Sequence, residues 1–126
     1  MKKVYNEKAP KPVGPYSQAV KAGNLLFISG TLPIDPTTGN IIDGDIETLT
    51  KRTLENIKII LEGERLSFNN LVKVNIFIKD MSNFSKINGV YERYFKDHLP
   101  ARAVVEVSNL PKNSPIEIEA IASYEN

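Results

Sequence analysis

The sequence predicts an α+β fold in which one mixed β-sheet of about six strands is covered on one face by two helices. Two observations predict this fold. Five segments have the composition and alternation of strands, and two longer segments repeat their apolar residues at helical spacing. Strand–helix–strand order also occurs twice, and right-handed crossovers place both helices on the same face of one sheet. We expect residues 1–126 to form a single domain with one hydrophobic core.

The N-terminal part is predicted to hold a proline-rich loop and a β-hairpin. Residues 8–15 contain three of the eight prolines, which exclude a helix or a central strand there. Strand-like runs follow at 16–22 and 25–29, and the Gly23-Asn24 pair between them is a hairpin signal. The sequence also allows a short strand near residues 3–6.

Two amphipathic helices are predicted. After a turn-rich loop over residues 31–44, Asp45 caps a helix that runs to about Glu64. Its apolar stripe contains Ile46, Leu49, Thr53, Ile57, Ile60 and Leu61, with Leu54 beside it. Ser82 or Asp80 caps a second helix that ends near Lys96. Its apolar face contains Phe84, Ile87, Val90, Tyr91, Tyr94 and Phe95.

Three further strands are predicted at 72–79, 102–108 and 116–124. With both helices on one face, the other face of the sheet has no covering layer in this chain. A face that carries Val104, Ile121 and a few charges is too apolar to be simply solvated, so we expect another subunit to cover it. Alternation assigns to this face Arg102, Val104 and Glu106 from one strand and Glu117, Glu119, Ile121 and Ser123 from the next.

The composition excludes several kinds of chemistry. The chain has no cysteine and one histidine, so a disulfide, an iron–sulfur cluster, a thiolate nucleophile or a two-histidine metal site within one chain is excluded. The formal net charge of +1 does not supply the basic surface that nucleic-acid binding needs. Apolar runs are too short to span a bilayer, and the start Met1-Lys2-Lys3 continues into polar residues, so we expect a cytosolic protein with no membrane association.

Neither the glycine-containing loop before the first helix, nor the single histidine, nor the spacing of the acidic residues indicates a binding or catalytic site. Residues 39–44 have the glycine spacing of a phosphate loop, but Asp45-Ile46 stands where lysine and Ser or Thr are needed. We expect the single histidine, His98, to interact with the dipole at the C-terminus of the second helix. No acidic cluster has the spacing of a metal-binding loop.

One charged pair remains as a candidate site. Arg102 opens one strand and Glu117 lies in the following one, and alternation places both on the uncovered face. From spacing alone, a cross-strand charge pair on a solvated face is the simpler explanation, and such a pair contributes little to stability.

Several separated motifs carry a family resemblance over essentially the whole chain. They are Gly14-Pro15-Tyr16-Ser17-Gln18-Ala19, Phe27-Ile28-Ser29-Gly30, Asn88 with Tyr91, Pro100-Ala101-Arg102-Ala103-Val104-Val105-Glu106-Val107, Leu110-Pro111-Lys112 and Ile116-Glu117-Ile118-Glu119-Ala120-Ile121-Ala122. In this order and spacing they resemble the RidA/YjgF family of reactive-intermediate deaminases. The resemblance implies a chorismate-mutase-like fold and a homotrimer, with a central barrel of three sheets and active sites between subunits.

The same resemblance implies an activity. Family members hydrolyse reactive 2-imino acids, the tautomers of 2-aminoacrylate and 2-aminocrotonate, to 2-keto acids and ammonia. These enamines are released by pyridoxal-phosphate-dependent serine and threonine dehydratases, which are the implied functional partners. The family uses no cofactor of its own.

The resemblance also implies roles for six residues. Arg102 would hold the substrate carboxylate with a bidentate fork, and Glu117 would position and deprotonate the attacking water. Backbone around Gly30 and Val104 would bind the imine nitrogen or the hydrated intermediate. Tyr16 would close the cleft, and Asn88 would support it by a hydrogen bond.

Simpler roles stay open for some of these residues. Tyr16 can be an interface residue, Asn88 a brace between helix and loop, and Gly30 only part of a turn. Many family members carry cysteine where this chain has Val104, and the loop His98-Leu99-Pro100 looks short, which can reshape the mouth of the cleft. Two other functions also stay open: a non-catalytic, carboxylate-binding regulatory trimer and, less favoured by the charge, a ribonuclease that inhibits translation.

Overall fold

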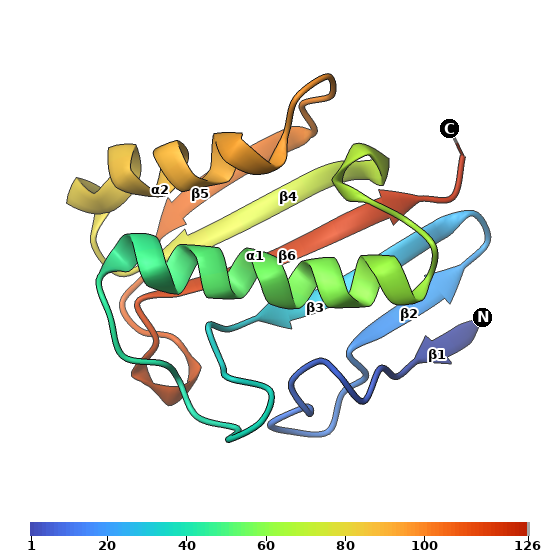
Figure 1. Cartoon of the computed structure of the whole chain (residues 1–126), viewed down its shortest axis with the longest axis horizontal. Coiled ribbons are helices and arrows are strands. Elements are labelled where there is room, and N and C mark those ends of the chain that lie inside the picture. The colour runs from blue at the N-terminus through green and yellow to red at the C-terminus, as the bar shows by residue number, and fades with distance from the viewer. Residues whose placement is uncertain (126) are drawn as a thin grey trace.

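A computed structural model describes residues 1–125 and contains one six-stranded sheet with two α-helices on one face (Figure 1). The predicted α+β class and layer arrangement are confirmed. The strand order across the sheet is β1-β2-β3-β6-β4-β5. The elements are β1 (Lys2–Val4), β2 (Ala19–Ala22), β3 (Leu25–Thr31), α1 (Ile46–Gly63), β4 (Leu71–Ile78), α2 (Phe84–Tyr91), β5 (Ala101–Glu106) and β6 (Ile116–Ser123).

The pairing explains why the last strand lies in the middle of the sheet. β6 pairs antiparallel with both β3 and β4, and β5 pairs parallel with β4 at the edge. β3 therefore runs parallel to β4 on the far side of β6, so α1 and α2 each connect parallel strands. Two crossovers of the same hand in the same direction bring both helices to one face, as predicted.

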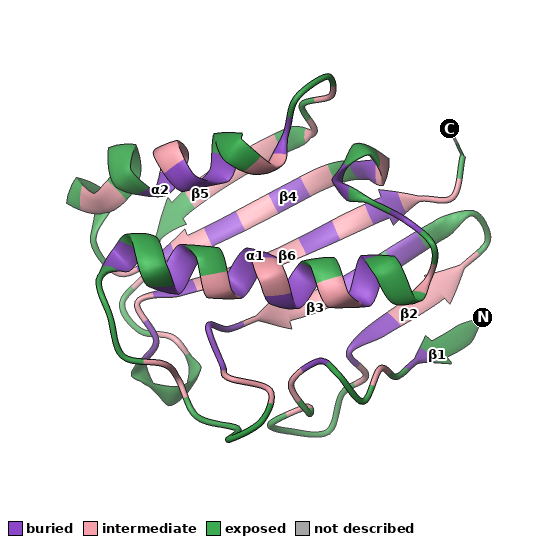
Figure 2. Cartoon of the chain, viewed as in Figure 1, coloured by how far each residue is buried: buried purple, intermediate pink, exposed green. Residues whose placement is uncertain are grey.

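α1 forms where the sequence predicts it. The Asp45 side chain accepts a hydrogen bond from the backbone N–H of Thr48 at 2.9 Å, which satisfies one of the free donors of the first turn. One side of the helix is buried against the sheet and the other is exposed (Figure 2). The helix ends at Gly63, one residue before the expected Glu64.

α2 is shorter than predicted. Asp80 caps a 3-10 turn (Met81–Asn83), and α2 itself ends at Tyr91 before a second 3-10 turn (Glu92–Tyr94). His98 consequently lies beyond the helix and not at its C-terminus. Its Nε2–H donates a hydrogen bond to the carbonyl oxygen of Leu71 at 2.6 Å, which joins the loop after α2 to the start of β4.

The structure corrects the predicted face of β5. Arg102 and Val104 project towards the helices and not from the uncovered face, because Arg102 is in register with the buried Val74 of the neighbouring parallel strand. The wholly apolar Ala103 and Val105 side faces away from the helices. An arginine is tolerated on the helix side because β5 is an edge strand and α2 provides a polar partner beside it.

The uncovered face carries exposed apolar side chains from three strands. Leu25 and Phe27 of β3 and Val105 of β5 are 37, 43 and 44% exposed, and Ile121 of β6 is half-buried. Glu117 lies on this face as predicted, level with Phe77 of β4. This is the face for which the sequence predicts a covering subunit.

Candidate active site

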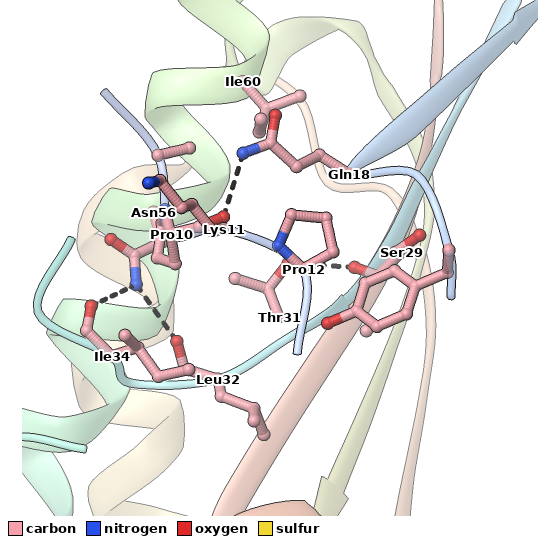
Figure 3. Close-up of a pocket in the computed structure, with 13 residues that line it drawn as sticks. Pro10, Lys11, Pro12, Gln18, Ser29, Thr31, Leu32, Ile34, Asn56 and Ile60 are labelled. Atoms are coloured by element: carbon pink, nitrogen blue, oxygen red, sulfur yellow. Dashed lines mark hydrogen bonds between the residues drawn. The ribbon is translucent and has the colours of Figure 1, made fainter. Parts of the chain in front are cut away.

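A buried glutamine fixes the loop that leads into β2. The side-chain oxygen of Gln18 accepts a hydrogen bond from the backbone N–H of Asn6 at 2.6 Å. Its amide nitrogen donates to the carbonyl oxygen of Asn6 at 3.1 Å. It also donates to the carbonyl oxygen of Pro10 at 2.9 Å (Figure 3). Both ends of this amide are satisfied, so the proline-rich segment is held against the sheet although it has no regular structure.

A buried asparagine of α1 fixes the segment after β3. Asn56 donates hydrogen bonds to the carbonyl oxygens of Leu32 at 3.0 Å and Ile34 at 2.9 Å (Figure 3). Its own oxygen accepts from the Arg52 guanidinium. Asn56 and Gln18 both line a cavity of about 40 Å³ behind the end of β3. The end of β3, which carries Gly30, is therefore anchored by a helix on one side and a loop on the other.

Three of the predicted site residues line one pocket. Tyr16, Gly30 and Glu117 border a cavity of about 330 Å³ at the end of β3. The phenol oxygen of Tyr16 accepts a hydrogen bond from the backbone N–H of Val13 at 3.1 Å, which holds the exposed ring at the pocket. The pocket is completed by Val13, Ser29, Leu32, Pro111 and Glu119.

In its present position, the Glu117 carboxyl group leaves no room for a side chain at Gly30. A Cβ atom at position 30 would lie 2.8 Å from both Cδ and Oε2 of the Glu117 carboxyl group, well inside van der Waals contact. The pairing of β3 with β6 is irregular between Ile28 and Thr31, so the strand backbone at Gly30 approaches the carboxylate closely. The absence of a side chain at Gly30 thus makes room for the Glu117 carboxyl group. This role is more specific than the turn position that the sequence analysis left open for Gly30.

The carboxyl group of Glu117 is poorly solvated. Burial raises its pKa above the ordinary value of 4.5, and the nearby negative charge of Glu119 raises it further. A raised pKa makes a carboxylate a better proton acceptor near neutral pH, provided that it stays ionised. The environment of Glu117 is consistent with a general base.

The other two polar site residues line a second pocket. Arg102 of β5 and Asn88 of α2 border a cavity of about 340 Å³ together with Tyr91, Glu92, Leu99 and Pro100. Nη1 of Arg102 donates a hydrogen bond to Oδ1 of Asn88 at 2.8 Å. Asn88 holds one edge of the guanidinium, and the remaining N–H groups of the fork are available for an anion.

Arg102 and Glu117 do not meet within one chain. β4 lies between their strands, Arg102 is level with Val74 and Glu117 with Phe77, and the two side chains are on opposite faces of the sheet. The expectation that both project from the uncovered face is therefore wrong. Val104 lines neither of the two pockets, and its side chain packs against the core.

The two pockets contain residues to which the sequence analysis gave no role in the candidate site. Glu119 lies two residues after Glu117 and shares its face, so period-two alternation could have added it. Tyr91 lies one helical turn after Asn88, a spacing that places both on one side of α2. Ser29 and Pro111 belong to motifs of the family resemblance, and the tertiary structure brings both to the first pocket.

Among residues 1–125, the structure contains no cluster of three or more His, Cys, Asp or Glu side chains suited to a metal ion. No helix within that range is both long and apolar enough to cross a membrane.

Comparison with known proteins agrees with the fold and the motifs. The family model described as Endoribonuclease L-PSP matches residues 6–124. A RutC family protein of Pyrococcus horikoshii is 58% identical over 122 residues, covering 97% of each chain. The 2-iminobutanoate/2-iminopropanoate deaminase of Salmonella typhimurium is 42% identical over 124 residues, covering 96% of each chain. A solved structure from Thermotoga maritima is 52% identical, covers 100% of this chain and 99% of its own, and superposes with a TM-score of 0.96.

The sheet topology and the matches together define a small α+β protein of the class that includes the imino acid deaminases. The chain belongs to the RidA/YjgF family, the family of the Endoribonuclease L-PSP model.

Proposed function

We propose that this protein hydrolyses reactive 2-imino acids to 2-keto acids and ammonia. The observation that carries the proposal is the pair of half-sites in one chain, a guanidinium held by Asn88 and a carboxyl group of raised pKa beside Gly30. The Salmonella relative with a deaminase name supports it at the level of the family.

Arg102 would bind the substrate carboxylate. Its guanidinium can form two parallel hydrogen bonds to a planar carboxylate, and Asn88 limits its rotation. An anchored carboxylate fixes the position of the adjacent imine carbon, so that the attacking water needs little further orientation.

Glu117 would transfer the protons. It accepts a proton from a water molecule while the water oxygen bonds to the imine carbon and the C=N electron pair moves to nitrogen. Glu117 then returns that proton to nitrogen, which gives a carbinolamine. Transfer of the hydroxyl proton to nitrogen, again through Glu117, breaks the C–N bond, forms the keto group and releases ammonia.

A second copy of the chain would complete the site. Because the Arg102 pocket and the Glu117 pocket are separate in one chain, substrate can contact both groups only where two subunits meet. The exposed apolar side chains of the uncovered face supply a reason for such association. We propose the homotrimer that the family resemblance implies, with Tyr16, Gly30 and Glu117 of one subunit opposite Arg102 and Asn88 of the next.

The test is a coupled assay. Addition of the protein to threonine dehydratase and threonine should hasten release of 2-ketobutyrate, because the dehydratase product passes through 2-aminocrotonate and its imine. Arg102→Ala should abolish the effect. Arg93→Ala, at an exposed arginine beyond the end of α2, is the matched control and should retain it.

The outcomes separate this function from the alternatives. No acceleration by the wild type, while a known deaminase works in parallel, would refute the proposal. Carboxylate binding without turnover, lost in Arg102→Ala, would indicate a regulatory binding protein instead. Cleavage of RNA by nuclease-free preparations, lost in the same variant, would indicate a ribonuclease, for which a net charge of +1 offers little binding surface.

A further inference from the structure

One side of α2 is arranged around the Arg102 guanidinium. Asn88 accepts its Nη1–H, and the ring centroids of Tyr91 and Phe84 lie 4.8 and 5.8 Å from its central carbon. Asn88 follows Phe84 by four residues and Tyr91 follows Asn88 by three, so the three side chains lie in one row on the helix. A helix that supplies an acceptor and two aromatic rings to one cation fixes both the direction and the plane of that cation.

Tyr91 is the less expected member of this row. Its side chain is only 6% exposed, and its ring packs against that of Phe95, with 4.5 Å between the centroids and a tilt of 33°. Its hydroxyl group has no hydrogen-bond partner among the described residues. Burial raises the pKa of Tyr91 to about 12, so the phenol is neutral and forms no ion pair with Arg102.

The contact that Tyr91 does make is through the face of its ring, which lies at cation–π distance from the guanidinium. We propose that Tyr91 is a positioning residue for Arg102, acting through the face of its aromatic ring and not through its hydroxyl group. This inference rests on the proposed function for its effect on turnover, but not for its effect on Arg102 itself.

The experiment uses three variants of the full chain. Tyr91→Phe keeps the ring and removes the hydroxyl group. Tyr91→Met removes the ring and keeps most of the buried volume, so that the fold is retained. Tyr94→Met is the matched control, because Tyr94 lies just beyond α2, packs against Phe68 and does not line the Arg102 pocket.

Two measurements are made on each variant. The first is the side-chain Nε–H signal of Arg102 in the NMR spectrum of the free protein, which reports the ring current and needs no activity. The second is the pair of kcat and KM for imine hydrolysis, with the affinity for 2-ketobutyrate as a check on carboxylate binding.

We expect Tyr91→Phe and Tyr94→Met to match the wild type in both measurements. Tyr91→Met should move the Arg102 signal towards that of a free arginine. It should raise KM roughly tenfold with little change in kcat, the size expected when a partly desolvated cation–π contact is lost.

Two results would overturn the inference. If Tyr91→Phe is as impaired as Tyr91→Met, the hydroxyl group and not the ring is used. If Tyr91→Met leaves the Arg102 signal and the 2-ketobutyrate affinity unchanged, the ring does not position the arginine. If Tyr91→Met does not fold, Tyr91→Leu, which also removes the ring, replaces it, with the same shift of the Arg102 signal expected and no shift contradicting the inference. Failure of the deaminase proposal would appear as absent turnover in the wild type, while the Arg102 signal would still respond to Tyr91→Met.

Discussion

Two residues carry the proposed chemistry, and each is prepared by its immediate neighbours. The Glu117 carboxyl group is half-buried beside the backbone of Gly30, where a Cβ atom would crowd it, and Glu119 adds a second negative charge nearby. The Arg102 guanidinium is held by one hydrogen bond and two aromatic rings of α2. The proposed reaction therefore needs neither a cysteine nor an additional histidine.

The raised pKa of Glu117 predicts the pH dependence of turnover. A general base must be ionised, so kcat/KM should fall as the pH drops through a value above 4.5, the ordinary pKa of glutamic acid. Glu119→Gln removes the like charge, lowers the pKa of Glu117 and should move this limb of the profile to lower pH. Glu62→Gln, at an exposed position on α1, is the control and should leave the profile in place. If the acidic limb of the kcat/KM profile moves to higher pH or does not move in Glu119→Gln, the assignment of Glu117 as the general base is contradicted.

The raised pKa of Glu117 has opposite consequences for activity and for stability as the pH changes. A carboxyl group whose pKa is raised on folding favours the folded state most when it is protonated, below its unfolded pKa, and this contribution is lost as the pH rises through the raised value. Glu117→Gln should therefore abolish turnover and yet unfold at no lower denaturant concentration than the wild type at pH 7. Such a combination is common for residues retained for chemistry.

At the scale of elements, α1 and α2 serve different ends of the sheet. α1 fixes the end of β3 through Asn56, and α2 holds the arginine of β5. Neither connection follows from the apolar periodicity that predicted the two helices, because both depend on polar residues on or beside the buried faces.

Asn56 gives the element-scale prediction. Asn56→Leu leaves the buried carbonyl oxygens of Leu32 and Ile34 without their donor, so the free energy of unfolding should fall by about 2–4 kcal/mol. Urea titration followed by circular dichroism measures the change. Asn69→Leu, at an exposed asparagine between α1 and β4, should change it by less than about 0.5 kcal/mol. An equal effect of the two substitutions would show that the bridge from α1 to β3 is unimportant.

The sequence was sufficient to predict the elements, their layers and the start of α1, because these depend on local periodicity and on the Asp45 cap. It was not sufficient to assign the face of Arg102. Alternation distinguishes two sides of a strand but does not say which side faces the helices, and in β5 the wholly apolar side is the outer one. The length of α2 also depended on its change to a 3-10 turn at Glu92, which no residue pattern marks.

The candidate site was predictable in part. The resemblance identified residues that do lie together in two pockets, but spacing could not show that β4 separates Arg102 from Glu117. The steric relation between Gly30 and Glu117 joins two strands and is visible only in three dimensions.

At the scale of the whole molecule, the uncovered sheet face and the divided site have one common explanation. The exposed rings and aliphatic chains of this face would be covered by other copies of the chain, and the same contact would join the two pockets. Assembly and activity are then lost together when this face is made polar.

Phe27→Asp tests that link. The side chain is 43% exposed in a single chain, so the charge is tolerated by the monomer fold but opposes burial between subunits. Sedimentation should show smaller species than the wild type, with circular dichroism unchanged and imine hydrolysis lost. Lys58→Asp, at an exposed position on α1 away from the sheet, serves as a comparison for any general effect of the charge. An active, monomeric Phe27→Asp protein would separate assembly from function.

The central claim, that one subunit supplies Arg102 and its neighbour supplies Glu117, is tested most directly by mixing two inactive variants. Arg102→Ala and Glu117→Gln, unfolded together in equal amounts and refolded, should assemble at random. About a quarter of the sites between neighbouring subunits would then contain both wild-type groups, so roughly a quarter of the wild-type rate of imine hydrolysis should return. Arg102→Ala mixed with a chain that carries both substitutions is the control and should stay inactive. No recovery in the first mixture, although mixed oligomers form, would show that the two groups do not act across a subunit boundary.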